Sequence, residues 1–89
     1  LEIRREVAVG DFPLRIAVRP QGDVAVTSDL GDAALSVIDT ATGIRTRTIA
    51  LDDRANAQAR QQVTIIWSPD GQRIYVAETG SDTVAEVDY

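Results

Sequence analysis

The sequence LRIAVRPQG, at residues 14–22, returns as VTIIWSPDG at residues 63–71, where apolar residues again lead into a turn with proline and glycine. The two turns lie 49 positions apart, and Asp39 and Asp88 keep the same separation further along the chain. Repeats with periods of roughly 20 to 50 residues are typical of stacked architectures, in which one unit cannot bury its own faces. The repeat therefore predicts two similar units that pack against each other.

Each copy consists of short apolar segments separated by turns rich in glycine, proline and aspartate, which is the pattern of β-strands. The predicted strands are 7–9, 14–18, 24–26, 35–38, 44–51, 63–67, 74–76 and 83–87. Residues 24–26 and 65–67 are apolar at consecutive positions, which predicts strands covered on both faces. Residues 5–9 and 45–51 alternate, which predicts strands with one face in water. Four short strands per unit, the inner ones covered and the outer one half exposed, are typical of a β-propeller blade.

The fold class predicted from this pattern is all-β, with two repeats of four-stranded antiparallel propeller blades that form part of a larger or oligomeric ring. With the strands of a unit lettered a to d from the centre outward, the chain reads d-a-b-c-d-a-b-c. Residues 1–89 form one segment, with a first unit at about 1–43 and a second at about 44–89. The alternative, a sandwich of unrelated hairpins, does not require turns that recur at one spacing.

Two blades cannot close a ring, because propeller rings typically contain about four to eight blades. An isolated pair would leave sheet edges and apolar faces open to association. If the 89 residues are the whole chain, we expect the outer strand near Val7 to pair with the edge at 83–87 of a second copy. About three or four copies would then form the ring. The alternative partner is the remaining set of blades of a longer propeller.

Four segments resemble the YVTN-type β-propeller repeat: SVIDTATG at 36–43, SPDGQRIYVA at 68–77, TGSDTV at 79–84 and VGDFP at 9–13. The turn of Ser, Pro, Asp and Gly is also shared with WD-repeat and TolB-like propellers. The resemblance implies a seven-bladed propeller of a bacterial or archaeal protein, in the periplasm, at the cell surface or secreted. The family includes surface-layer proteins and the propeller parts of some lactonase-like and redox enzymes. Glu78 stands where this family usually has asparagine, and no catalytic motif of an enzymatic relative is matched.

The composition excludes several kinds of chemistry. The 89 residues contain no cysteine and no histidine, which excludes disulfides, thiolate metal sites and the usual general base and haem ligand. The net charge of −5 disfavours nucleic acid, which requires clustered basic residues. No apolar run approaches the roughly 20 residues that span a bilayer. We expect no catalytic, cofactor-binding or metal-binding residue, no nucleic-acid partner and no insertion into a membrane.

One loop face carries most of the acidic residues that no turn explains. In a propeller, the d–a and b–c loops emerge on the same face. The predicted partner-binding face consists of Asp29, Asp32, Asp52, Asp53, Arg54, Arg60, Glu78 and Asp82. Such a face attracts a cation or a basic partner, although none of the spacings matches a calcium loop. The alternative is a solvated acidic rim.

The one insertion that interrupts the repeat falls in a predicted loop of the same face. Strand d aligns at an offset of 42 and strand a at an offset of 49, so seven residues are inserted within 52–61. The composition of this insertion predicts a short helix that begins after Asp52 and Asp53. Insertions on a loop face are where repeat proteins usually place specificity. The alternative is a surface excursion without a binding role.

Other residues have structural interpretations. Gly22 and Gly71 predict tight turns with positive φ, and the carboxylates of Asp39 and Asp88 are expected to cap the turns that follow them. Trp67 is expected to pack between blades rather than to stack on a ligand.

The predicted function is a non-catalytic β-propeller scaffold or binding module of YVTN type, able to assemble into a closed ring. The alternative is a fragment of a propeller enzyme, either a lactonase-like hydrolase or a periplasmic redox enzyme, whose active site lies in other blades.

Overall fold

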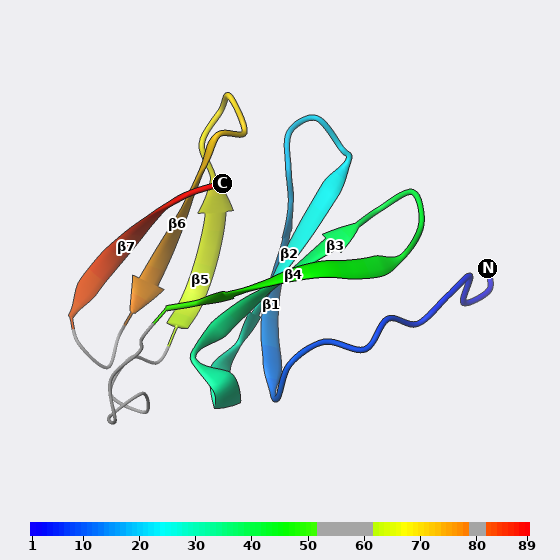
Figure 1. The fold of residues 1–89 in the computed structure, drawn as a ribbon, viewed down its shortest axis with the longest axis horizontal. Helices are drawn as coiled ribbons and strands as arrows, with labels where there is room; N and C mark the ends of the chain where they lie inside the picture. Colours follow the sequence, from blue (N-terminus) through cyan, green and yellow to red (C-terminus); the bar gives the residue numbers. More distant parts are fainter. Residues whose placement is uncertain (52–61, 79–81) are drawn as a thin grey trace.

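The computed structural model describes residues 1–51, 62–78 and 82–89, and these form two antiparallel sheets. The first sheet consists of β1 (Pro13–Val18), β2 (Val24–Asp29), β3 (Ala34–Asp39) and β4 (Ile44–Ala50), in that order, and the short 3₁₀ helix η1 (Leu30–Asp32) joins β2 to β3. The second sheet consists of β5 (Gln62–Trp67), β6 (Arg73–Glu78) and β7 (Thr83–Asp88). Within each sheet, every strand pairs with the next along the chain, as in successive hairpins (Figure 1). The predicted all-β fold of antiparallel blades is confirmed.

The repeated turns close the first hairpin of each sheet in the same way. The amide of Gly22 donates to the carbonyl of Arg19 at 2.7 Å, and the amide of Gly71 donates to the carbonyl of Ser68 at 2.9 Å. Both glycines have positive φ, 80° and 74°, a conformation that a side chain disfavours. The predicted tight turns are confirmed at both positions.

The two sheets pack face to face, and β5 lies against the inner strands β1 and β2 (Figure 1). Seven buried aliphatic residues fill the interface: Val24, Val26, Leu35 and Val37 from the first sheet, and Ile65, Ile74 and Val76 from the second. We call the face of the first sheet that carries its four residues the front face of that sheet, and the face of the second sheet that carries its three residues the rear face of that sheet. Removal of this apolar surface from water is the main stabilising contribution to the fold.

The outward side of the second sheet corrects one expectation. We expected residues 65–67 to be covered on both faces, but the side chain of Ile66 is 57% exposed and that of Val84, on β7, is 67% exposed. Strand residues alternate between faces, so these side chains point away from the first sheet and form the front face of the second. No described segment lies on that side. β2, in the first sheet, is buried along its whole length, as predicted.

The predicted strand at 7–9 is wrong for this chain. Residues 1–9 belong to no sheet, and they run on the side of the first sheet opposite the second sheet (Figure 1). A strand requires a neighbour for its amide and carbonyl groups, and no described strand lies beside this segment. The predicted helix within 52–61 lies outside the described residues.

The sheets also divide the chain differently from the sequence units. β4 pairs with β3 along its length, so the outer strand at the start of the second sequence unit completes the first sheet. The described second sheet therefore holds three strands. A sequence unit of 44–89 thus extends across both sheets.

Trp67 lies between the sheets, where it was expected. Its ring is half-buried and packs against the central core, and its indole Nε1 donates to the carbonyl of Ala17 at 3.2 Å. Tyr89 meets it edge to face at 5.1 Å between ring centroids, and the guanidinium of Arg19 lies 4.8 Å from the centre of the Tyr89 ring. These contacts join the end of the chain to the first sheet.

We predict that Trp67→Ala lowers the free energy of unfolding by about 3 kcal/mol, because it leaves a cavity between the sheets. Trp67→Phe should lower it by about 1 kcal/mol, since an aromatic ring stays and the hydrogen bond to Ala17 is lost. Urea unfolding followed by circular dichroism measures both values. Equal losses in the two variants would contradict a packing role for the ring.

Candidate functional site

The candidate site is the end of the two sheets at which β2 and β6 end and β3 and β7 begin (Figure 1). Four of the eight residues predicted for the partner-binding face lie outside the described residues: Asp52, Asp53, Arg54 and Arg60. The other four are described, and they divide into two buried and two exposed carboxylates.

Asp29 is a buried structural residue, which corrects its place in the predicted binding face. It ends β2, and its side chain is 0% exposed. Its carboxylate accepts hydrogen bonds from the hydroxyls of Thr27 at 2.8 Å and Ser36 at 2.5 Å. These donors come from strands β2 and β3, so the carboxylate stabilises the sheet edge instead of facing a partner.

Glu78 requires the same correction. It lies 49 positions after Asp29, at the end of β6, and is 2% exposed. The hydroxyl of Thr83, at the start of β7, donates to its Oε1 at 3.4 Å. Each sheet therefore buries one acidic side chain at the end of its second strand, with a hydroxyl donor from the third strand.

Asp32 is exposed, and it fixes the chain as it enters β1. Its Oδ2 accepts the amide of Asp11 at 2.8 Å. The preceding residue, Gly10, donates its own amide to the hydroxyl of Ser36 at 3.3 Å. A Cβ at Gly10 would lie 2.6 Å from Asp32 Oδ2 and 2.7 Å from Asp29 Oδ2, so only glycine fits there. The Val-Gly-Asp segment thus crosses directly over the two carboxylates.

Asp82 is also exposed, and its backbone has a positive φ of 56°. Ala33 occupies the equivalent position in the first sheet with a φ of 50°. Aspartate tolerates this left-handed conformation better than most residues with a side chain. Asp32 and Asp82 are therefore the described carboxylates of the predicted face that solvent, and hence a partner, can reach.

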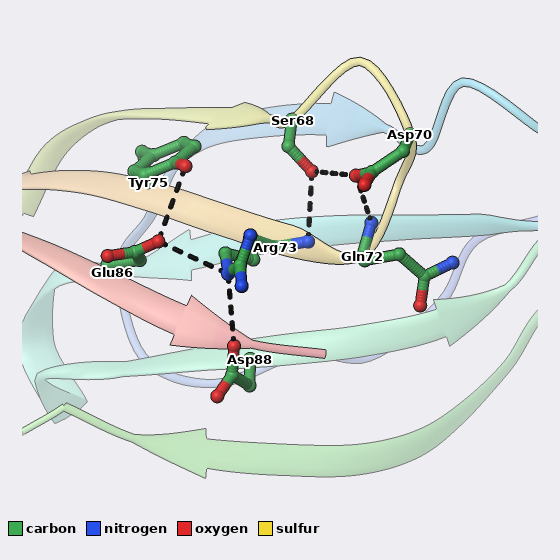
Figure 2. Close-up of polar contacts among 7 residues, drawn as sticks. All are labelled: Ser68, Asp70, Gln72, Arg73, Tyr75, Glu86 and Asp88. Atoms are coloured by element: carbon green, nitrogen blue, oxygen red, sulfur yellow. Dashed lines mark hydrogen bonds and ion pairs between the residues drawn. The ribbon is translucent and has the colours of Figure 1, made fainter.

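The turn at the opposite end of the second sheet is held by a second set of polar contacts (Figure 2). The Ser68 hydroxyl donates to Asp70 Oδ1 at 2.6 Å, and the Gln72 amide donates to the same oxygen at 3.0 Å. The amide of Arg73 donates to the Ser68 hydroxyl at 3.0 Å. The pKa of the Asp70 carboxyl is lowered below its ordinary value. The main cause is the hydrogen bond from the Ser68 hydroxyl, and the second is the hydrogen bond from the Gln72 amide.

An exposed ladder follows on the outer surface of this sheet (Figure 2). Arg73 Nε lies 3.2 Å from a Glu86 oxygen and 3.3 Å from an Asp88 oxygen, and the Tyr75 hydroxyl donates to Glu86 at 3.4 Å. Ion pairs at such exposure contribute little to stability. Asp39, the equivalent of Asp88, caps its turn as predicted, because its Oδ1 accepts the amides of residues 41 and 42 at 2.8 and 3.0 Å.

The described residues contain neither a cluster of metal ligands nor a helix that could cross a membrane. Within 1–51, 62–78 and 82–89, no group of three or more Asp, Glu, His or Cys side chains could hold a metal ion. In the same ranges, no helix has the length and apolar character to cross a membrane.

Comparison with known proteins supports the fold. No protein-family model matches the chain, and no curated protein matches it in sequence. Among solved structures, it is similar to a chain of hydrazine synthase from Kuenenia stuttgartiensis, a protein that contains a β-propeller, with a TM-score of 0.76 and 24% identity. The fold is that of β-propeller blades. The similarity covers 98% of this chain and 23% of the hydrazine synthase chain, so these residues correspond to less than a quarter of that chain.

Sequence reasoning missed the burial of Asp29 and Glu78, although one signal was present. Both residues are the last of an apolar strand, and hydroxyl residues lie at neighbouring positions of the first sheet, at Thr27 and Ser36. A carboxylate with hydroxyl donors across the ladder is typical of a buried, satisfied acid.

We predict that Ser68→Ala raises the pKa of Asp70 toward its ordinary value, because it removes the strongest donor to the charged carboxylate. Gln72→Ala is the control, since its backbone amide is retained and the pKa should not change. Carboxyl titration by NMR measures both. In the native chain the lowered pKa means that the stabilisation is complete above the ordinary pKa of Asp and is lost as pH falls through the lowered value. A Ser68→Ala variant with an unchanged Asp70 titration would contradict this role.

Proposed function

We propose that the chain is a non-catalytic segment of a β-propeller of YVTN type, which serves as a scaffold and presents its loop edge to a basic partner. One observation carries this proposal. The acidic groups of the loop edge divide into a buried pair that holds the sheets, Asp29 and Glu78, and an exposed pair on the same edge, Asp32 and Asp82.

The use of the polar side chains favours a scaffold over a catalyst. The buried hydroxyls of Thr27 and Ser36 are bonded to Asp29, and the Ser68 hydroxyl is bonded to Asp70. A nucleophilic hydroxyl needs an adjacent base that is free to accept its proton, and these carboxylates already serve as fixed acceptors in turns and sheet ends. The sequence also lacks histidine and cysteine.

The alternative function is the propeller part of an enzyme whose reactive groups lie in other blades. Hydrazine synthase is, by its name, an enzyme, and it has the same fold over a region of this length. Under either function these residues would position a partner or a neighbouring blade. The resemblance to the YVTN family also favours a location in the periplasm or at the cell surface.

The partner is inferred from charge. The chain has a net charge of −5, and Asp32 and Asp82 are exposed at the end of the sheets where β4 ends and β5 begins. Carboxylates on one edge attract a cationic surface and raise its association rate. Such attraction is screened by salt over about 8 Å at physiological ionic strength.

We predict that an oligo-arginine peptide, as a probe of basic partners, binds the chain and that Asp32→Asn combined with Asp82→Asn weakens binding about fivefold at low salt. Glu2→Gln combined with Glu6→Gln is the control, because it removes the same charge from the exposed N-terminal segment. Fluorescence anisotropy at several salt concentrations measures the affinities. Equal weakening in both double variants would show attraction to net charge alone and would overturn the loop-edge site.

A further inference from the structure

The turn that joins β5 to β6 contains the one Asp-Gly dipeptide of the sequence, at Asp70 and Gly71. In an Asp-Gly pair the glycine amide nitrogen can attack the aspartate side chain, because glycine has no Cβ to hinder the approach. This turn cannot exchange its glycine for a less reactive residue. Gly71 has a positive φ of 74°, and a Cβ there would overlap Oε1 of Gln21. The fold therefore retains a dipeptide with a known route of spontaneous modification.

The reaction of such a pair is a cyclisation followed by a hydrolysis. The amide nitrogen of Gly71 would form a bond to Cγ of the protonated Asp70 carboxyl group, and the carboxyl hydroxyl would leave as water with the amide proton. The product is a five-membered succinimide ring. Addition of one water molecule then breaks one of its two C–N bonds. Cleavage at Cγ restores aspartate, whereas cleavage at the backbone carbonyl gives isoaspartate, in which the main chain runs through the side chain.

The folded turn restrains the carboxyl group that would be attacked. Oδ1 of Asp70 accepts the Ser68 hydroxyl at 2.6 Å and the Gln72 amide at 3.0 Å (Figure 2). These two donors fix the orientation of the carboxylate, and they also lower its pKa, the Ser68 hydroxyl most. The ionised carboxylate reacts poorly with an amide, because its oxygen is a much poorer leaving group than the hydroxyl of the protonated acid.

The attacking nitrogen is restrained as well. The amide of Gly71 donates to the carbonyl of Ser68 at 2.9 Å, which closes the turn. Gly71 is buried, although Asp70 beside it is exposed. Before the nitrogen can reach Cγ, this hydrogen bond must break and the peptide group must rotate. Cyclisation therefore requires the turn to open.

The first sheet supplies two further contacts that oppose this rotation. Nε2 of Gln21 donates to the carbonyl of Asp70 at 2.8 Å, and Nε of Arg19 donates to the carbonyl of Gly71 at 2.9 Å. Both donors belong to the turn between β1 and β2. The carbonyl groups on either side of the reactive amide are thus fixed by side chains of the neighbouring sheet.

The repeat shows that the restraint accompanies the reactive dipeptide. The first turn has Gln21 where the second has Asp70, and Arg19 where the second has Ser68. A glutamine side chain would have to close a six-membered ring, which forms far more slowly than the five-membered one. The turn that lacks the aspartate therefore also lacks the serine hydroxyl that restrains it.

We propose that Asp70 is a site of isoaspartate formation that the contact between the two turns keeps closed, so that modification begins when the sheets separate at these turns. Isoaspartate lengthens the backbone of the turn by one methylene group and moves the carboxylate away from Ser68 and Gln72. The modified turn cannot restore the contact with Gln21, and the separation becomes irreversible. This inference goes beyond the proposed function and is independent of the acidic loop edge.

The test is a long incubation of the 89-residue chain in warm, mildly acidic water enriched in heavy oxygen, which labels each hydrolysed succinimide. Peptide mapping then locates the isoaspartate. The folded chain should form it at Asp70 at least about tenfold more slowly than the chain in urea, because reaction requires local opening. Ser68→Ala removes two hydrogen bonds and should raise the rate in the folded chain about tenfold, whereas Gln21→Ala removes one and should raise it about fivefold.

Two variants serve as controls. Gln72→Ala keeps the backbone amide that donates to Asp70, and it should leave the rate unchanged. Thr46→Ala removes a hydroxyl hydrogen bond to the carbonyl of Val37, at 3.4 Å on the far strands of the first sheet. It should also leave the rate unchanged, and it tests whether a loss of stability elsewhere is enough. Circular dichroism before the incubation confirms that each variant is folded.

Equal rates in the folded chain and in the chain in urea would overturn the proposal. Rates in both Ser68→Ala and Gln21→Ala that match the native rate would also overturn it. An equal rise in Thr46→Ala would assign the effect to global unfolding and would remove the role of the turn contact. Isoaspartate at another aspartate, with none at Asp70, would contradict the assignment of the site.

Discussion

The rest of the structure depends on the contact between the front face of the first sheet and the rear face of the second. A sheet with apolar residues on both faces needs cover on both, because uncovered apolar surface costs about 25 cal/mol for each Å² left in water. β2 shows the satisfied condition, since all six of its residues are buried. In the second sheet, by contrast, the apolar side chains of Ile66 and Val84 remain exposed on one face. Stability in this fold is therefore a property of neighbouring pairs of sheets, as in other repeat proteins.

The polar groups of the loop edge follow from the same packing. Because the strand ends are covered, a carboxylate placed there must find donors within the protein. Asp29 finds them in Thr27 and Ser36, and the crossing at Gly10 closes over it. The edge that looks uniformly acidic in the sequence is thus a layered structure, with an inner row of acids bonded to the sheet and an outer row in solvent. Only the outer row has charge to offer a partner.

The sequence predicts the local features of this fold well, because strands and tight turns are determined by nearby residues. The turns at Gly22 and Gly71, the cap at Asp39 and the strands within the two sheets all follow from short patterns. The strand expected at 7–9 and the cover expected for Ile66 depend instead on a neighbour that no local pattern supplies. The burial of Glu78 was missed for a related reason, since its position after an apolar strand was interpreted as the start of a loop.

The two repeated turns are in contact, and the side chain that makes the contact comes from the first turn. The Gln21 side chain reaches across to the next turn, where its Nε2 donates to the carbonyl of Asp70 at 2.8 Å, and the absent side chain of Gly71 leaves room for it. At the equivalent position Asp70 is shorter and already bonded to its own turn. A glutamine at this position forms a hydrogen bond to the next turn, whereas an aspartate forms hydrogen bonds only within its own turn. Alternating these two residues along a stack of sheets would make every second joint stiffer than the one between, so that a curved stack would bend unevenly around its axis.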